Sequence, residues 1–451
     1  MPPIVLASGD AVPLGWVAPF AVLLLCIAVL PLTKPHFWEH NRNKGIVAAL
    51  LSLPVAVWLF TGPEHGTHWL EESLLDYAAF IGLLGALFTI SGGIYLRGSL
   101  AGTPLTNTGF LAVGGLIASF VGTTGASMLL IRPLLRANAA RQRKAHIVIF
   151  FIFAVSNAGG LLTPLGDPPL FLGFLNGVPF TWTFRLWVEW ATVLGALLVV
   201  FNVWDQRVLD KEEVERPGSQ LEEVQKIAEP LSIQGKANLI LLLGVLAVSY
   251  FVGGSSLDAT LGLSPAAKKL AQTALYVGLA GASLRLTSKE VRAANRFGWG
   301  PIIEVAVLFA GIFVTMIPAV QYLEVAGRDG TIHLHEPWQF FWASGALSSF
   351  LDNAPTYKTF ASLAVGVLQM DGEAGLGVLT TTPAGNALLT AVACGSVFMG
   401  ANTYIGNGPN FMVKAIAEEN GVKMPSFFGY MIWSVGILVP LFVLVTFVFF
   451  R

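Results

Sequence analysis

The sequence predicts an all-α polytopic membrane protein built from two inverted repeats, each with about five transmembrane helices, a re-entrant hairpin and a broken helix. Three observations predict this fold class. Of the 451 residues, 54% are hydrophobic and 12% are charged, whereas soluble domains carry about 25% charge. Several apolar stretches exceed the ~18 residues that a membrane-spanning helix needs. Two of these stretches are interrupted by glycines, prolines and polar residues at matching places in the two halves.

The elements of each repeat can be assigned in chain order. In residues 1–204, uninterrupted apolar spans lie at 12–32, 46–61, 74–96 and 182–204, with a hairpin of small residues at 108–135 and a broken helix at 146–174. Residues 205–236 are too charged to cross a bilayer, so they are expected to form a cytoplasmic linker with one amphipathic helix around 213–227. In residues 237–451, the spans lie at 237–252, 266–284, 299–322 and 426–450, with a hairpin at 338–368 and a broken helix at 379–418.

The first broken helix contains the most informative stretch, residues 156–171 (SNAGGLLTPLGDPPLF). Four glycines or prolines and then Pro168-Pro169 interrupt the helix around Asn157 and Asp167. Irregular backbone at membrane depth is tolerated only when it is buried in protein or lines a wet cavity. Secondary transporters build their binding sites in this way, around broken helices near the middle of the bilayer.

The second half repeats this pattern. Residues 166–171 (GDPPLF) match residues 406–411 (GNGPNF) in position, and each broken helix follows a hairpin with a polar tip, at 121–127 and at 348–356. Two matches in the same order, on either side of a polar linker, indicate an internal repeat. Five crossings per half then require the second half to enter the membrane upside down.

Loop charges give an independent orientation, because Lys and Arg concentrate on the cytoplasmic side. Loops predicted to lie outside, at 62–72, 175–181, 253–265 and 369–377, contain neither residue. We therefore expect both termini outside and the linker in the cytoplasm. Lys268, Lys269 and Arg328 do not fit this arrangement.

Polar side chains at membrane depth are costly and usually functional. The candidates for binding an ion or substrate share a place at the two hairpin tips or the two breaks: Thr123, Thr124, Ser127, Ser156, Asn157, Thr163, Asp167, Asp352, Asn353, Thr356, Asn402, Thr403, Asn407 and Asn410. Such hard oxygen ligands suit Na+ or protons, and Asn157, Asp167, Asp352 and Asn402 are the expected Na+ ligands. Helix N-termini beside the breaks would instead favour an anion.

Structural roles compete with these assignments. Asp167 and Asp352 could each cap the helix that follows it. Lys358 and Arg132, in the second arms of the hairpins, are expected to reach the interface or to pair with a carboxylate.

Other features narrow the function further. Arg185 and Glu189, four residues apart on a helix, are expected to form an ion pair. The histidines and the two cysteines give no metal or disulfide pattern, and no glycine-rich stretch ends in the Gly-Lys-Ser/Thr of a phosphate-binding loop. With no basic patch interleaved with aromatics, nucleic-acid binding is not expected.

The motifs of the two breaks and tips resemble a known superfamily. Residues 156–160 (SNAGG) with 164–167 (PLGD), and residues 351–356 (LDNAPT), resemble the sodium/proton antiporter branch of the ion transporter superfamily, which also holds citrate, dicarboxylate and arsenite carriers. The stretch 160–180 is closer still to bacterial members labelled as citrate transporters or sodium:proton antiporters. The second break, 401–410, is richer in carboxamides than that antiporter branch, and Pro168-Pro169 replaces small polar residues; both departures favour a larger, carboxylate-bearing substrate.

The resemblance implies a scaffold part and a transport part, a homodimer and a bacterial inner membrane. The leading hypothesis is a Na+/H+ antiporter working by alternating access, in which Na+ and H+ compete for Asp167 and Asp352. The alternative is Na+- or H+-coupled uptake of citrate or a dicarboxylate, bound by Asn157, Thr163 and Asn402 with Thr403. An ion channel fits the broken helices less well, and no enzyme activity or cofactor beyond the coupling ions is expected.

Overall fold

Helices make up most of the chain. The computed structural model describes residues 4–5, 11–98, 100–215, 232–254, 262, 264–372 and 375–451. The long helices are α1 (Ala18–Thr33), α3 (Asn41–Thr61), α4 (Gly66–Ser91), α5 (Pro104–Val121), α6 (Thr123–Ala137), α7 (Ala145–Ala154), α9 (Trp187–Glu215), α11 (Ala237–Ala247), α13 (Pro265–Leu286), α15 (Gly300–Arg328), α16 (Pro337–Ser348), α17 (Asn353–Val367), α18 (Pro383–Met399), α19 (Gly408–Glu419) and α20 (Phe427–Phe449). The short ones are α2 (Pro35–Trp38), α8 (Pro168–Leu175) and α14 (Lys289–Ala294).

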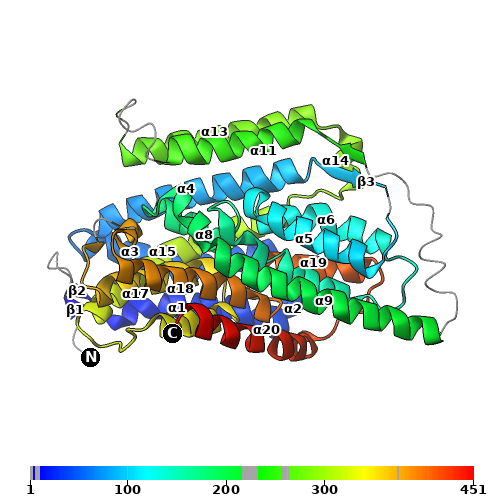
Figure 1. The fold of residues 1–451 in the computed structure, drawn as a ribbon. Coiled ribbons are helices and arrows are strands. Elements are labelled where there is room, and N and C mark those ends of the chain that lie inside the picture. Colours follow the sequence, from blue (N-terminus) through cyan, green and yellow to red (C-terminus); the bar gives the residue numbers. More distant parts are fainter. Residues whose placement is uncertain are drawn as a thin grey trace.

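The long helices run roughly alongside one another, as Figure 1 shows. Within the described residues, nine helical segments are long and apolar enough to cross a membrane. They fit a multi-pass membrane protein. The helix α13 is long enough but less apolar and does not belong to the nine, and α11 with its π-helical continuation Val248–Gly253 is a shorter apolar segment.

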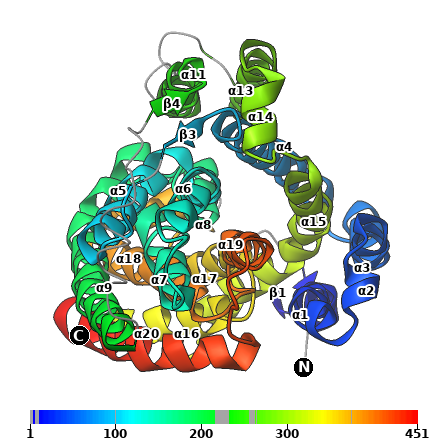
Figure 2. The same cartoon turned by 90° about the vertical axis from the view of Figure 1, so that its right-hand side faces the viewer.

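The two hairpins and the two broken helices lie at the centre of the bundle. Figure 2, which looks along the helices, shows α6, α7, α8, α17, α18 and α19 surrounded by α9, α20, α1, α15 and α4. The apolar run of α7 (AHIVIFFIFA) has no polar face, and residues 146–154 are all buried. A helix that is hydrophobic on every side belongs in the interior of the protein, so the sequence itself places the first broken helix at the centre.

Both hairpins and both breaks lie where the sequence predicts them. The hairpin α5–α6 turns at Gly122, whose φ of 81° favours glycine, and α16–α17 turns between Ser348 and Asn353. The first break separates α7 from α8, with a short 3-10 helix at Ala158–Leu162. The second separates α18 from α19, with a 3-10 turn at Gly400–Asn402.

Two predicted boundaries are wrong. Helix α4 begins at Gly66, inside the stretch 62–72 that was expected to be a loop. Helix α9 continues to Glu215, so the first eleven residues of the predicted linker 205–236 are helical, and Asp205 is fully buried. The amphipathic helix expected around 213–227 lies mostly outside the described residues.

Short strands pair at the two ends of the molecule. Near the N-terminus, β1 (Ile4–Val5) pairs with β2 (Ala11–Val12), and β3 (Tyr95–Arg97) pairs with β4 (Ser232–Gln234). The second ladder joins the chain before the first hairpin to the chain before α11. In Figure 1 both termini lie in the left half of the view, whereas β3 and the end of α9 lie at the right.

Candidate ion and substrate site

Four helix N-termini lie together at the place where the two hairpin tips meet the two breaks, which we call the centre. Helix α6 begins at Thr123, α17 at Asn353, α8 directly after Asp167 and α19 directly after Asn407. The side chains of these four residues are buried, and those of Thr123, Asn353 and Asn407 each donate a hydrogen bond to Asp167. Each N-terminus carries a partial positive charge from its unpaired N–H groups, so the centre favours a negative group.

Asp167 is the acidic residue that makes these contacts. Its Oδ1 accepts from Thr123 Oγ1 at 2.8 Å and from Asn407 Nδ2 at 3.2 Å, and its Oδ2 accepts from Asn353 Nδ2 at 2.5 Å. Although Asp167 occupies the N-cap position of α8, its side chain makes no capping hydrogen bond there. Its three donors come from both hairpins and the second break, so the carboxylate joins the two halves instead of capping its own helix.

Three carboxamides extend the network from Asp167 into the second break. Asn407 Nδ2 also donates to the Asn157 side chain (3.2 Å) and to the Ser156 carbonyl (3.1 Å). Asn157 Nδ2 donates to Asn410 Oδ1 at 2.7 Å, and Asn410 donates to the carbonyls of Gly400 and Thr403, both at 2.9 Å. Asn157 and Asp167, both from the first break, are thus connected through Asn407 of the second.

The two halves make matching contacts between hairpin and break. Thr163 Oγ1 donates to the Ser119 carbonyl, and Thr403 Oγ1 donates to the Ser349 carbonyl. The Ser119 hydroxyl donates to Gly159 O at 2.5 Å, and the Ser349 hydroxyl to Met399 O at 3.2 Å. Thr163 and Thr403 therefore fasten each break to its own hairpin, which is a structural role.

These contacts identify two serines that the sequence reasoning missed. Ser119 opens the stretch SFVGT at 119–123, and Ser349 opens SFLDN at 349–353. An alignment of these two stretches, and of GxxTxxG at 160–166 with 400–406, would have revealed both serines. The two glycines of each GxxTxxG stretch lie in close contact. A Cβ on Gly166 would clash with the backbone of Gly160, and a Cβ on Gly406 would clash with that of Gly400.

The remaining candidate residues lie around this centre without touching Asp167. Asp352 caps α17, with Oδ1 accepting from the Ala354 N–H at 3.0 Å, and Thr356 donates to the Asp352 carbonyl at 3.0 Å. Ser127 and Ser156 share a hydrogen bond of 2.8 Å. Thr124 lies in the first turn of α6 and is only partly buried.

Two carboxamide oxygens near the centre are buried and have no hydrogen-bond partner among the described residues. They are Asn353 Oδ1 and Asn402 Oδ1, while the nitrogens of the same side chains donate to Asp167 and to Ser349. A buried acceptor without a donor costs about 1–3 kcal/mol. Each oxygen is therefore ready to accept a cation or a hydrogen-bond donor that is not a protein group.

A buried acidic residue of α4 was also missed. Asp76 is 3% exposed and pairs with Lys269 of α13 at 2.5 Å and with Lys358 of α17 at 3.6 Å. Lys358 therefore pairs with a carboxylate, as expected. The pairing with Asp76 explains why Lys269 lies on the side predicted to be outside, where Lys and Arg are otherwise absent from the loops. Arg328 is a similar exception, because it pairs with Glu324 at 3.1 Å. In the sequence, Asp76 could have been identified as the single acidic residue of the predicted span 74–96.

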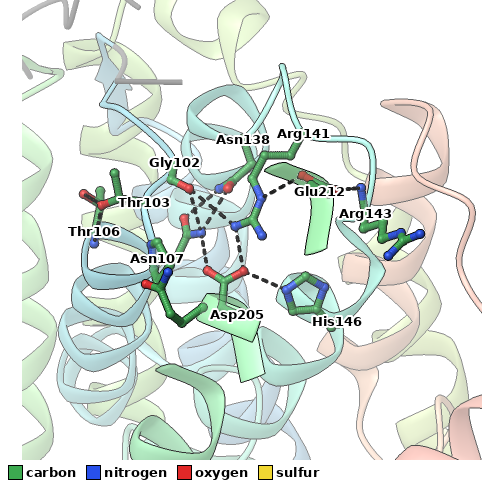
Figure 3. A network of polar contacts seen from close by, with 12 residues as sticks. Gly102, Thr103, Thr106, Asn107, Asn138, Arg141, Arg143, His146, Asp205 and Glu212 are labelled. Atoms are coloured by element: carbon green, nitrogen blue, oxygen red, sulfur yellow. Dashed lines mark hydrogen bonds and ion pairs between the residues drawn. The ribbon is translucent and has the colours of Figure 1, made fainter. Parts of the chain in front are cut away.

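A second buried polar network fixes the opposite end of the first hairpin (Figure 3). Asp205 of α9 accepts from Arg141 at 2.6 Å and from His146 at 2.7 Å through Oδ1, and from Asn107 at 2.9 Å through Oδ2. Asn107 and Asn138 exchange hydrogen bonds between the two arms of the hairpin. This network ties the hairpin base and the start of α7 to α9, and no candidate site residue belongs to it.

The side chains that hydrogen-bond to Asp167 are uncharged. Among the described residues, the side chains that hydrogen-bond to Asp167 are a hydroxyl and two carboxamides, so none is basic. No group of three or more His, Cys, Asp or Glu residues that could hold a transition metal is found in the described part of the chain. The partners of Asp167 present N–H and O–H donors to the carboxylate, and the unpartnered Oδ1 of Asn353 adds one neutral oxygen of the hard type that cations bind.

Comparison with known proteins gives one match. A family model described as "Putative citrate transport" matches residues 9–450, which is nearly the whole chain. No curated protein matches the chain.

Proposed function

The chain belongs to the putative citrate transport family, and from this premise we propose that it is a secondary active transporter that exchanges Na+ for H+ at Asp167. Family membership supports transport across a membrane. The identity of the transported ion is our proposal. It rests on one observation, the buried Asp167 carboxylate held by donors from both hairpins and the second break.

The type of ligand at the centre favours Na+. Asp167 supplies charge, and the unpartnered oxygens Asn353 Oδ1 and Asn402 Oδ1 are neutral ligands of the type that Na+ binds. Exposed carbonyls at the breaks would complete the coordination, as unwound helices do in other transporters.

Competition between ions for one carboxylate produces exchange. Na+ needs Asp167 ionised, whereas the proton neutralises it, so each ion displaces the other. When the loaded centre opens in turn to each side of the membrane, Na+ leaves where H+ enters. No covalent chemistry is required, which fits a protein that is not an enzyme.

Alternating access follows from a further part of the proposal, that the two halves are inverted repeats. The matched contacts of Thr163 with Ser119 and of Thr403 with Ser349 support it. So does the placement of both termini toward one end of the bundle (Figure 1), because five crossings per half return the C-terminus to the side of the N-terminus. Loop charges favour the cytoplasm for the other end.

Coupled uptake of a carboxylate such as citrate is the second candidate. The family description favours it directly, and four converging helix N-termini would attract carboxylate groups. In this case Asp167 would bind the coupling Na+ or H+, and the substrate would bind beside it.

One set of flux measurements tests both candidates. The purified chain in proteoliposomes should move protons when a Na+ gradient is imposed without citrate, and Asp167→Asn should abolish this flux. Asp329→Asn, an exposed acid at the end of α15, is the matched control and should behave as wild type.

Two results would overturn the antiport proposal. Normal Na+-dependent proton flux in Asp167→Asn would remove Asp167 from the mechanism. If wild-type protein shows no exchange without citrate but accumulates radiolabelled citrate under the same gradient, coupled carboxylate uptake takes its place.

A further inference from the structure

A pocket of about 630 Å³ lies apart from the central site, between the first and second halves. Its walls come from the 3-10 helix Phe180–Leu186, the first turn of α9, the first turns of α18 and the end of α20. Arg185, Glu189, Asn386 and Thr390 supply polar groups, and Phe449 and Phe450 supply an apolar edge.

The two charged groups of this pocket do not pair with each other. The expected ion pair between Arg185 and Glu189 is not formed within the described residues, where Arg185 Nη1 donates to Asn386 Oδ1 at 2.6 Å. Asn386 is itself fixed by Trp182 Nε1 at 2.7 Å and by the carbonyls of Thr380 and Thr382. The guanidinium is therefore held in place by the opposite half of the protein.

Glu189 keeps a buried oxygen without a partner. Its Oε2 is shielded from solvent and accepts no hydrogen bond in the described structure. Glu189 lies in the first turn of α9, where the helix N-terminus favours an acid. That position explains the charge of Glu189 but leaves Oε2 without a donor, and a buried unpaired oxygen is costly.

The position of the pocket along the helices indicates the level of the lipid head groups. The helix α9 begins here, α18 begins here and α20 ends here, and all three belong to segments that can cross a membrane. Phe184 and Trp187 beside the pocket are 44% and 62% exposed. Exposed aromatic rings at the ends of transmembrane helices mark the boundary between the apolar core and the head groups.

We propose that this pocket binds the head group of a phospholipid that carries both a phosphate and a primary ammonium, as ethanolamine lipids do. Arg185 binds the phosphate, because a guanidinium matches phosphate oxygens in geometry and charge. Glu189 Oε2 accepts a hydrogen bond from the ammonium, and Phe449 and Phe450 lie against the first part of the acyl chains. The proposal does not depend on which ion or substrate the protein transports.

Lipid retention in native mass spectrometry tests the site on the whole protein. Wild-type protein should retain the ethanolamine lipid about tenfold better than a choline lipid with the same chains, the ratio expected for one charged hydrogen bond. Lipids with one or two methyl groups on the nitrogen should fall between them, because each methyl group removes an N–H donor. Equal retention across this series would overturn the proposal without any variant.

Variants assign the two charges separately. Glu189→Gln should remove the preference for ethanolamine over choline, whereas Arg185→Gln should weaken retention of both lipids because both carry phosphate. Glu215→Gln, at the other end of α9 and paired with Arg143 at 2.8 Å, should change neither. An unchanged preference in Glu189→Gln would contradict the site, and equally tight binding of soluble phosphoethanolamine would show a solute site instead of a lipid site.

Discussion

Asn353 of the second hairpin donates its Nδ2 to Oδ2 of Asp167 across a distance of 2.5 Å, although the two residues are 186 positions apart in the chain. The contact joins the first break directly to the tip of the opposite hairpin. Any movement that separates this hairpin from the break must therefore break a hydrogen bond to Asp167. Among the described residues of the centre, Asp167 is the only acidic side chain bonded to residues of both halves.

Replacement of Asn353 should weaken cation binding. Asn353→Ala removes one donor to Asp167 and one unpartnered oxygen, and the loss of a charged hydrogen bond corresponds to about a tenfold rise in the Na+ concentration at half-maximal flux. Thr359→Ala, later in α17 and donating only to carbonyls of its own helix within the described structure, is the control and should leave this concentration unchanged. A normal Na+ dependence in Asn353→Ala would show that the contact is structural.

The two lysines that pair with Asp76 should contribute unequally to stability. Lys358→Met leaves Asp76 paired with Lys269 at 2.5 Å, so its effect on the free energy of unfolding should be below about 1 kcal/mol. Lys269→Met leaves only the 3.6 Å pair, and the expected cost is about 2 kcal/mol. This is less than for a dry pair, because the lysine side chains are 13–20% exposed. Unfolding in detergent measures both, and the reverse order would contradict the prediction.

Asp205 should be the most costly single charge to remove. Asp205→Asn leaves the buried guanidinium of Arg141 without its closest counter-charge, and breaking a buried pair costs about 3–5 kcal/mol. Glu215→Gln on the same helix removes an exposed pair with Arg143 and should cost less than about 1 kcal/mol. The two unfolding transitions should differ clearly; similar values would mean that the network in Figure 3 adds little to stability.

Two neighbouring glycines should respond in opposite ways to alanine. A Cβ on Gly406 would lie 2.6 Å from the Gly400 carbonyl oxygen and 2.7 Å from that of Ser348, so Gly406→Ala should displace the second break and destabilise the protein by at least 1–3 kcal/mol. A Cβ on Gly408 meets nothing within 4 Å. Gly408→Ala should be neutral or slightly stabilising, because alanine favours the helix that begins there. Equal unfolding temperatures would contradict the close packing of the break.

The architecture could be predicted from the sequence because each element has a strong local signal. Apolar length identified the spans, and glycine and proline marked the breaks at 158–167 and 400–407. The boundaries of α4 and α9 could not be predicted in this way. Helix α4 extends upstream of its apolar stretch to Gly66, and α9 extends beyond its own to Glu215, past Asp205, which is tolerated inside the protein by partners that are distant in the sequence.

The sequence identified residues of the candidate site but not the contacts between them. The sequence singled out Asp167, Asn353 and Asn407, yet their mutual contacts depend on how two hairpins and two breaks pack, which no local pattern encodes. The sequence allowed Asp352 both to cap its helix and to contact an ion; it caps α17, and its contact with an ion stays a prediction. Arg185 and Glu189 had ideal spacing for an ion pair, but Asn386 from the other half binds the guanidinium instead.

The meeting of four helix N-termini gives the centre a defined response to voltage. Each N-terminus contributes about half a positive charge, and Asp167 with Asp352, when both are ionised, balances the four of them approximately. An empty centre is then close to neutral, whereas a centre that holds one Na+ carries about one net positive charge. In the exchange proposed above, bound Na+ and bound H+ add the same charge, so the membrane potential acts equally on both loaded forms, with up to about 2.3 kcal/mol per 100 mV for a charge that crosses the whole field, and we expect one-for-one exchange to be independent of voltage.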